Sequence, residues 1–209
     1  MILLLLDYLG TMAFAVSGAL KGVRNGMDIF GVVVLAVVTA IGGGTIRDAL
    51  LDAPIFWLTD STYILLSLLM AIAVFMLFRL AQRTERILLV FDAIGLGVFT
   101  GIGAMRAADA GLGFLGIITM GLLTGIGGGL LRDVLAGKVP IVLREEVYAS
   151  ASIAGGLVFA GMLRAGLPEA AALSVAVGLT ILIRLLSIFL QWHLPSRPAA
   201  TEADSASEA

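Results

Sequence analysis

The sequence contains no cysteine and a single histidine, His193. The missing thiols exclude a disulfide, a thiolate metal site and a cysteine nucleophile, and one imidazole excludes a histidine-rich metal centre. No pair of residues has the spacing of an activated nucleophile and its base. We therefore expect no enzyme activity, no cofactor and no metal site beyond a permeant ion.

Charged residues are also scarce. They make up 13% of the 209 residues, whereas 60% of the residues are hydrophobic and the mean hydropathy is +1.09. Soluble domains typically have about 25% charged and about 45–50% apolar residues. The balance indicates an integral membrane protein. The first residues, MILLLLDYLG, lack a basic stretch and a small-residue cleavage site, so they predict a spanning helix rather than a removed signal peptide.

Seven apolar segments are long enough to cross a membrane, for which a helix needs about 20 residues. They cover roughly residues 2–20, 29–51, 62–80, 87–105, 113–136, 147–164 and 168–191. We therefore expect an all-α membrane protein whose seven-helix domain occupies residues 1–192. Residues 193–209 are rich in Ala, Ser, Glu and Pro, so we expect a disordered cytoplasmic tail there.

One short motif occurs twice, as GGGTIRD at residues 42–48 and as GGGLLRD at residues 127–133. The offset of 85 residues (127 − 42) continues outside the motif without a gap, and it relates Asp7 to Asp92. Self-similarity at a fixed offset is the mark of an internal duplication.

Each copy of the duplication contains three of the predicted helices. The copies cover about residues 1–82 and 86–165, and a seventh helix at about 168–192 is left over. An odd number of spans per copy places the two copies in opposite orientations, as an inverted-topology repeat.

Basic residues divide unevenly between the two sides that this topology predicts. One side carries only Arg106 and Arg164. The other side carries Lys21, Arg24, Arg79, Arg83, Arg86, Lys138, Arg144 and Arg197. The positive-inside rule makes the second side cytoplasmic. We therefore expect the N-terminus outside and the C-terminus in the cytoplasm.

The glycine triplets lie near the centres of the second and fifth predicted helices. They consist of Gly42, Gly43 and Gly44 in the first copy and of Gly127, Gly128 and Gly129 in the second. Each glycine costs about 0.8–1 kcal/mol relative to alanine inside a helix. Interrupted helices at matching positions of two repeats are typical of a transport site. We expect the two helices to kink or unwind at the triplets and to line a polar path; the alternative is close helix packing.

Two charged dipeptides, Arg47–Asp48 and Arg132–Asp133, follow the triplets within the same apolar segments. Ionisable residues inside spans indicate a functional site. Since neighbouring helical residues point about 100° apart, we expect these charges to pair with other helices rather than with each other. Asp7 and Asp92 are the candidate partners. The alternative role, compatible with the first, is a salt-bridge network that fixes the two halves together.

Equivalent small or aromatic residues accompany the triplets. Thr39 and Thr124 precede them and either coordinate a permeant ion or bond back to their own helix, which is the commoner use. Phe14 and Phe99 are candidates for a gate, although aromatic residues in spans more often serve packing.

The doubled GGG-x-x-R-D motif in a chain of three, three and one helices resembles the bacterial branch of the trimeric intracellular cation (TRIC) channels. The same sequence family also carries the labels uncharacterised membrane protein and glycine-transporter domain. The resemblance covers roughly residues 1–192. It implies a homotrimer in the bacterial inner membrane, surrounded by lipids and without a nucleic-acid partner. It also implies a separate pore in each protomer, lined by the kinked second and fifth helices and permeable to K⁺ with some Na⁺.

The residues themselves leave a channel and a transporter open. A half-helix that begins after a glycine break presents free N–H groups and a positive dipole, which suit a carboxylate. Unwound carbonyl groups suit a cation instead, so a small zwitterion would use both. The family resemblance favours the cation channel, and a secondary transporter of a small amino acid such as glycine is the alternative.

Overall fold

The computed structural model of the protein describes residues 2–77, 84–144 and 146–192, and the regular structure in these residues is helical. Seven helices have 16 or more residues: α1 (Ile2–Arg24), α2 (Ile29–Leu50), α4 (Thr62–Leu77), α5 (Thr84–Asp109), α6 (Phe114–Leu135), α7 (Glu146–Arg164) and α8 (Glu169–Leu190). Two short helices, α3 (Phe56–Thr59) and the 3₁₀-helix η1 (Ile141–Leu143), follow α2 and α6. The predicted tail, residues 193–209, lies outside the described residues.

Six of the described helices are long and apolar enough to cross a membrane, namely α1, α2, α5, α6, α7 and α8. Helix α4 is apolar but shorter, and its description ends at Leu77. The expectation of an all-α, multi-pass membrane protein is therefore confirmed.

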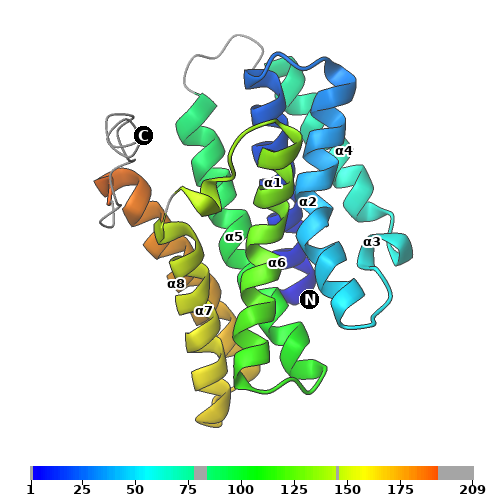
Figure 1. The fold of residues 1–209 in the computed structure, drawn as a ribbon. Coiled ribbons are helices and arrows are strands. Elements are labelled where there is room, and N and C mark those ends of the chain that lie inside the picture. Colours follow the sequence, from blue (N-terminus) through cyan, green and yellow to red (C-terminus); the bar gives the residue numbers. More distant parts are fainter. Residues whose placement is uncertain (1, 78–83, 145, 193–209) are drawn as a thin grey trace, which may run out of the picture.

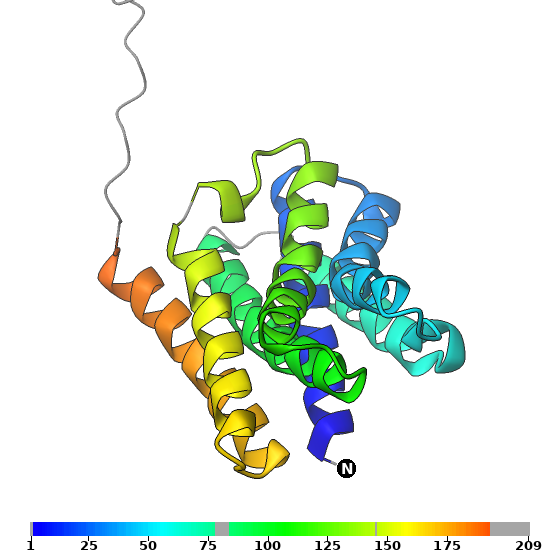
Figure 2. The ribbon, with the colours of Figure 1, turned by 60° about the horizontal axis from the view of Figure 1, so that its bottom comes forward.

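The helices form one bundle whose centre is the pair α1 and α5. Helix α1 packs on α2, α4 and α5, and α5 packs on α6, α7 and α8 as well as on α1. Helices α2 and α6 contact each other across this central pair. In Figure 1, α1, α4, α6 and α8 run in one direction and α2, α5 and α7 in the other; Figure 2 shows the same bundle from its lower end.

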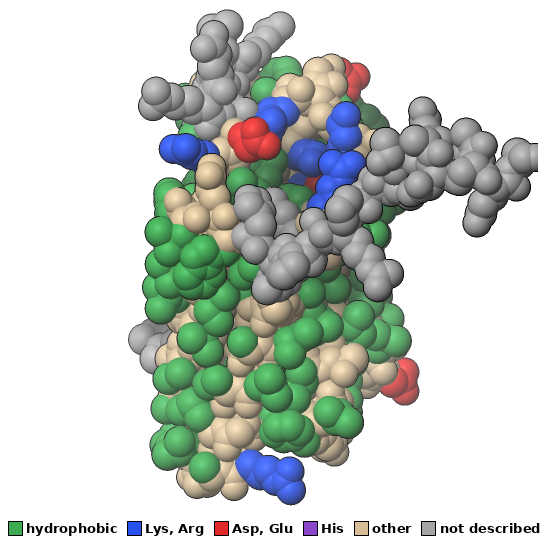
Figure 3. All heavy atoms as spheres, turned by 60° about the vertical axis from the view of Figure 1, so that its left-hand side comes forward, with side chains coloured by type: hydrophobic (Ala, Val, Ile, Leu, Met, Phe, Trp, Pro, Cys, Tyr) green, Lys and Arg blue, Asp and Glu red, His purple; other side chains and the backbone are tan. Residues whose placement is uncertain are grey.

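Charged side chains gather at the two ends of the bundle, with an apolar band between them (Figure 3). We name the ends by their charges. The basic end carries the described residues Lys21, Arg24, Arg86, Lys138 and Arg144. The opposite end carries Arg106 and Arg164, close to the connections α5–α6 and α7–α8. An apolar band between polar ends is the surface that a bilayer solvates.

Helices α1 and α5 end in the same way. Gly26 and Gly111, which are equivalent by the 85-residue offset (26 + 85 = 111), have φ angles of 69° and 76°. The N–H groups of the next residues reach back to the carbonyl groups of Gly22 and Ala107 over 3.1 and 3.0 Å. This arrangement is the glycine-terminated Schellman cap, which glycine adopts without steric cost. At both places the cap reverses the direction of the chain, and the helix that contains the glycine triplet follows.

The glycine triplets are helical. Helix α2 runs without interruption from Ile29 to Leu50 and α6 from Phe114 to Leu135, so both include their triplet. The expectation that the helices unwind at these glycines is therefore wrong for this structure, and a kink there, the other form of the expectation, stays a prediction. Each triplet instead lies where another part of the chain comes too close for a side chain, so the alternative, close helix packing, accounts for it.

Candidate ion pathway

Helices α2 and α6 cross at the middle glycines of their triplets. A Cβ atom on Gly43 would overlap the carbonyl oxygen of Thr124, and one on Gly128 would overlap the carbonyl oxygen of Thr39. The other triplet positions would bring a Cβ atom close to Leu131 (Gly42, 2.5 Å), Phe56 (Gly44, 2.5 Å), Gly43 (Gly127, 2.9 Å) and Tyr148 (Gly129, 2.8 Å). Backbone packs directly on backbone at this crossing, which holds the two halves of the duplication together.

One charged cluster lies on the basic side of the crossing, around Arg132. Its guanidinium group binds Asp133 in a bidentate manner, at 3.0 Å from Nε to Oδ1 and 3.1 Å from Nη2 to Oδ2. Its Nη1 atom donates to the Oδ1 atom of Asp92 and, over 2.5 Å, to the hydroxyl of Ser17. Arg132, Asp92 and Asp133 are each 0% exposed. Lys21 completes this Arg132 cluster, with its Nζ atom 3.0 Å from Oδ1 of Asp133.

The equivalent cluster on the other side of the crossing is held differently. The Nε atom of Arg47 lies 2.7 Å from Oδ1 of Asp48, and the guanidinium group stacks on the ring of Phe56 at 5.5 Å. Asp7, the counterpart of Asp92, accepts a hydrogen bond of 3.0 Å from the hydroxyl of Tyr63. The rings of Phe56 and Tyr63 meet edge to face at 4.5 Å, which connects the five residues into the Arg47 cluster.

The expected pairing of the charges is correct for Asp92 and wrong for the dipeptides. Asp92 pairs with Arg132 across helices, as predicted, but each arginine also binds the aspartate next to it in sequence. The long arginine side chain folds back along the helix and reaches the shorter neighbour in spite of the 100° separation. The roles of Ser17, Lys21 and Tyr63 in these clusters were not predicted. Tyr63 could have been found, because the 85-residue offset relates it to Tyr148.

Each motif aspartate also holds the connection that follows its helix. Oδ2 of Asp48 accepts the backbone N–H of Phe56 over 2.9 Å, and Oδ2 of Asp133 accepts the N–H of Ile141 over 3.0 Å. The two contacts are equivalent by the offset (56 + 85 = 141). They fix α3 and η1 against the ends of α2 and α6.

Thr39 and Thr124 bond back to their own helices. Their hydroxyl groups donate to the carbonyl oxygens of Leu35 over 2.5 Å and of Met120 over 2.7 Å. Phe14 and Phe99 stack on each other at 5.3 Å beside the crossing, where the ring of Phe14 lies 3.1 Å from the Cβ position of Gly128. Both aromatic side chains are buried, so their visible role is packing.

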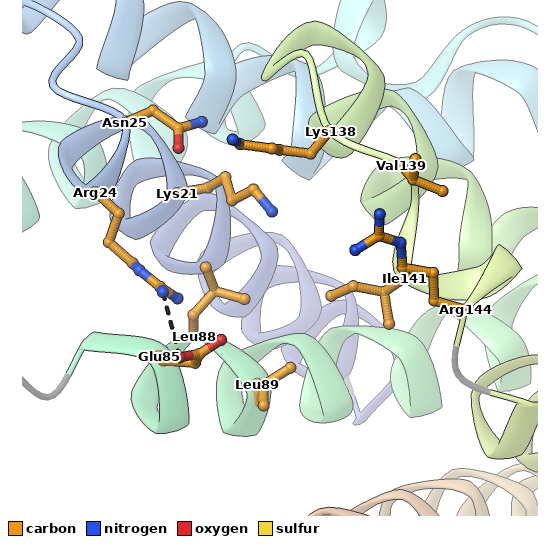
Figure 4. Close-up of a pocket in the computed structure, with 10 residues that line it drawn as sticks. All are labelled: Lys21, Arg24, Asn25, Glu85, Leu88, Leu89, Lys138, Val139, Ile141 and Arg144. Carbon is orange, nitrogen blue, oxygen red and sulfur yellow. Dashed lines mark ion pairs between the residues drawn. The ribbon is translucent and has the colours of Figure 1, made fainter. Parts of the chain in front are cut away.

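A vestibule opens at the basic end, with a volume of about 390 Å³. Figure 4 shows the charged ends of Lys21, Lys138 and Arg144 pointing into the same space between α1, α5 and η1. Its lining consists of Lys21, Arg24, Asn25, Glu85, Leu88, Leu89, Lys138, Val139, Ile141 and Arg144. We call this cavity the basic vestibule.

A second vestibule, of about 400 Å³, opens at the opposite end. Its lining consists of Arg47, Asp48, Leu51, Ala53, Pro54, Phe56, Thr59, Arg106, Asp109 and Ala110. Seven of these residues are the 85-residue counterparts of residues that line the basic vestibule, for example Arg106 for Lys21 and Thr59 for Arg144. The duplication therefore builds one cavity at each end, a feature that the sequence analysis missed.

The two charged clusters lie between the vestibules, one on each side of the glycine crossing. Lys21 in the basic vestibule binds Asp133, which binds Arg132 one turn from the glycine crossing. On the other side of the crossing, Arg47 lies one turn beyond Gly43 and lines the opposite vestibule.

Among the described residues, no group of three or more His, Cys, Asp or Glu side chains is placed to hold a metal ion.

A sequence model of one family, described as "Glycine transporter", matches the chain twice, over residues 4–79 and 89–164. The two matches are themselves 85 residues apart (89 − 4), so each copy of the duplication is one family unit. The UPF0126 inner membrane protein YadS of Escherichia coli is 45% identical over 192 residues, which are 90% of this chain and 92% of that protein. A UPF0126 membrane protein of Vibrio cholerae is 49% identical over 195 residues, 92% of this chain and 81% of that protein.

Solved structures identify the fold of this family. The TRIC trimeric intracellular cation channel orthologue from Rhodobacter sphaeroides superposes with a TM-score of 0.87 at 38% sequence identity, over 91% of this chain and 99% of that one. The chain belongs to the TRIC family. This confirms the resemblance that the doubled motif predicted, and the TRIC fold now places the motif at the crossing of α2 and α6.

Proposed function

We propose that this TRIC family member is a monovalent cation channel of the bacterial inner membrane. The observation that carries the proposal is the similarity, over nearly the whole chain, to solved TRIC cation channels at 36–38% identity. Relatives described as inner membrane proteins support the location. K⁺ is the main permeant ion in this proposal, and Na⁺ a lesser one.

In this proposal the ion path runs within one protomer, from one vestibule to the other past the crossing of α2 and α6. Two buried oxygen atoms support a polar path: Oδ1 of Asp7 and Oδ2 of Asp92 have no hydrogen-bond partner among the described residues. Ionised carboxylates that face a path attract cations and offset the arginines beside them. The pathway residues are those predicted from the sequence: Asp7, Thr39, Gly42, Gly43, Gly44, Arg47, Asp48, Asp92, Thr124, Gly127, Gly128, Gly129, Arg132 and Asp133.

Conduction requires the packed crossing to separate. We propose that α2 and α6 bend at their triplets to do so, because the triplets are the parts of these helices with the lowest helix propensity. A bend moves Gly43 away from Gly128 and lets Phe14 and Phe99 part.

The proposed topology has seven spans, of which α4 is one. Three spans of each copy form an inverted repeat, and α8 is the additional span. The alternating helix directions in Figure 1 support it, since α1 and α5, or α2 and α6, run oppositely. The excess of basic residues at one end supports a cytoplasmic basic end, with the N-terminus outside and the C-terminus inside. In this proposal three protomers form the channel and each has its own pore; the word trimeric in the name of the Rhodobacter sphaeroides relative supports the number of protomers.

The test is recording from purified protein in planar lipid bilayers with asymmetric KCl. We expect unitary currents that reverse near the K⁺ equilibrium potential. The family description "Glycine transporter" names the alternative. A silent bilayer together with uptake of glycine into proteoliposomes would overturn the channel proposal in favour of a transporter.

A further inference from the structure

The two vestibules have the same construction but different charges. The basic vestibule is lined by Lys21, Arg24, Lys138 and Arg144 against Glu85, which gives a net formal charge of +3 (4 − 1). The opposite vestibule is lined by Arg47 and Arg106 against Asp48 and Asp109, which gives zero (2 − 2). Their volumes, about 390 and 400 Å³, are nearly equal. The duplication thus repeats seven lining positions and the volume of the cavity, while the charge differs.

Two of the charges in the basic vestibule have no ion-pair partner among the residues that the structure describes. Arg24 lies 3.3 Å from Glu85 and Lys21 lies 3.0 Å from Asp133. Lys138 and Arg144 form no ion pair with any residue that the structure describes. Both side chains are exposed to the solvent that fills the vestibule.

The connection that carries Lys138 and Arg144 is fixed in place. Asp133 accepts the backbone N–H groups of Lys138, through its carbonyl, and of Ile141, through its carboxylate. The backbone that carries the two positive side chains is therefore fixed at the mouth of the cavity. A cavity lined by one sign of charge with low-dielectric walls focuses the field and changes the local concentration of ions. Cations are depleted at this mouth and not at the other.

We propose that Lys138 and Arg144 make the cation conductance asymmetric. Current carried by cations that enter through the basic vestibule is smaller than current carried by cations that enter through the opposite one. This inference rests on the proposed channel function. In this inference the two residues change the size of the cation current and do not line the narrow part of the ion path.

The experiment measures single-channel currents at equal and opposite voltages in symmetric KCl. The Debye length is about 30 Å at 0.01 M salt and about 3 Å at 1 M, so the asymmetry is expected in low salt and is screened in high salt. We expect currents that differ at least about twofold in 0.01 M KCl, and a ratio near one in 1 M KCl.

The duplication supplies matched variants, because the counterparts of Lys138 and Arg144 are Ala53 and Thr59. The double variant Lys138→Ala with Arg144→Thr is expected to raise the smaller current and give a ratio near one. The reciprocal variant, Ala53→Lys with Thr59→Arg, is expected to lower the larger current and also give a ratio near one. All four substitutions together reverse the ratio.

A second measurement uses folded, conducting protein. The chain contains no cysteine, so Lys138→Cys introduces a single thiol. A positively charged thiol reagent added to open Lys138→Cys channels is expected to restore the asymmetry, and a negatively charged one to bring the current ratio close to one, because it offsets the charge of Arg144. The side from which the reagent acts also identifies the orientation of each channel in the bilayer.

The outcomes separate this inference from the proposed function. Absence of any K⁺ current overturns the channel proposal, and the inference with it. K⁺ currents with equal amplitudes in 0.01 M KCl overturn the inference alone. An asymmetry that the double variant and the charged reagents leave unchanged overturns it as well, because the asymmetry then has another source.

Discussion

At the scale of single residues, the two motif arginines have different surroundings although they are equivalent in sequence. Arg132 is bound by two carboxylates and a hydroxyl and is 0% exposed. Arg47 has one carboxylate and one aromatic ring, and it borders a vestibule. Removing one member of a buried ion pair strands the charge of the other. The consequences of losing the two arginines should therefore differ.

We predict that Arg132→Leu destabilises the protein by about 3–5 kcal/mol, because Asp92 and Asp133 are left buried without their cation. Arg47→Leu, the matched control, is expected to cost less, since water in the vestibule reaches Asp48. Thermal unfolding of both variants in the same detergent checks this order. A smaller loss for Arg132→Leu than for Arg47→Leu would contradict it.

At the scale of helices, the crossing of α2 and α6 is one of the two extensive contacts between the copies, beside that of α1 and α5. It depends on the absence of a single atom at each middle glycine, since a Cβ atom there would meet a carbonyl oxygen. Helix backbones can separate to admit a methyl group, but they then lose contacts along the crossing. Overpacking of this kind typically costs about 1–3 kcal/mol.

We predict this loss for Gly43→Ala and for Gly128→Ala in thermal or denaturant unfolding. The control is Gly113→Ala at the start of α6, where a Cβ atom meets nothing within 4 Å and φ is −69°. The control replaces the N-cap residue of α6, where alanine is less favourable than glycine by a fraction of about 1 kcal/mol, so it should unfold closer to the wild type than either triplet variant does. Equal stability of Gly43→Ala and Gly113→Ala would refute the close crossing.

The glycine triplets also show how far the sequence predicts the site. The offset of 85 residues identified both triplets and their equivalence, and hydropathy located the helices that contain them. The mode of use was predicted wrongly, because helix propensity describes the helix alone. Gly43 and Thr124 are 81 positions apart (124 − 43), and their contact stabilises a helical backbone at the triplet although glycine has a low helix propensity. The vestibules escaped prediction because they are formed between elements.

A second element-scale prediction concerns the connection after α6. Asp133→Ala removes the carboxylate that accepts the N–H of Ile141 and also the partner of Lys21. A hydrogen bond to a charged group is worth about 1.5–3 kcal/mol, so the connection should open at least about tenfold more often. Cleavage by trypsin after Lys138 is expected to accelerate accordingly, as measured by fragment analysis over time.

Asp109→Ala, at the opposite end, is the control for that experiment and should leave the cleavage rate unchanged. An unchanged rate in Asp133→Ala would mean that η1 is held by other contacts.

At the scale of the whole molecule, each protomer contains a complete pair of vestibules. If three protomers conduct independently, a channel trimer shows three equal current levels. We predict that trimers mixed from wild type and the Lys138→Ala, Arg144→Thr variant show steps of two kinds, some asymmetric and some symmetric. Single-channel recording of co-purified mixed trimers checks this. A single step of intermediate asymmetry would instead indicate one shared pore.

The crossing of α2 and α6 also has a consequence for biosynthesis. The ribosome completes the Arg47 cluster within the first copy, because Asp7, Asp48 and Tyr63 all precede Leu77. Gly43, in contrast, has no partner until Thr124 has been made. The nascent first copy can therefore form the Arg47 cluster by itself, whereas Lys21 and Arg24 have their partners, Asp133 and Glu85, in the second copy. We therefore expect a chain that stalls before α6 is made to lack the packing partner of its glycine face and to be degraded more readily than the complete chain.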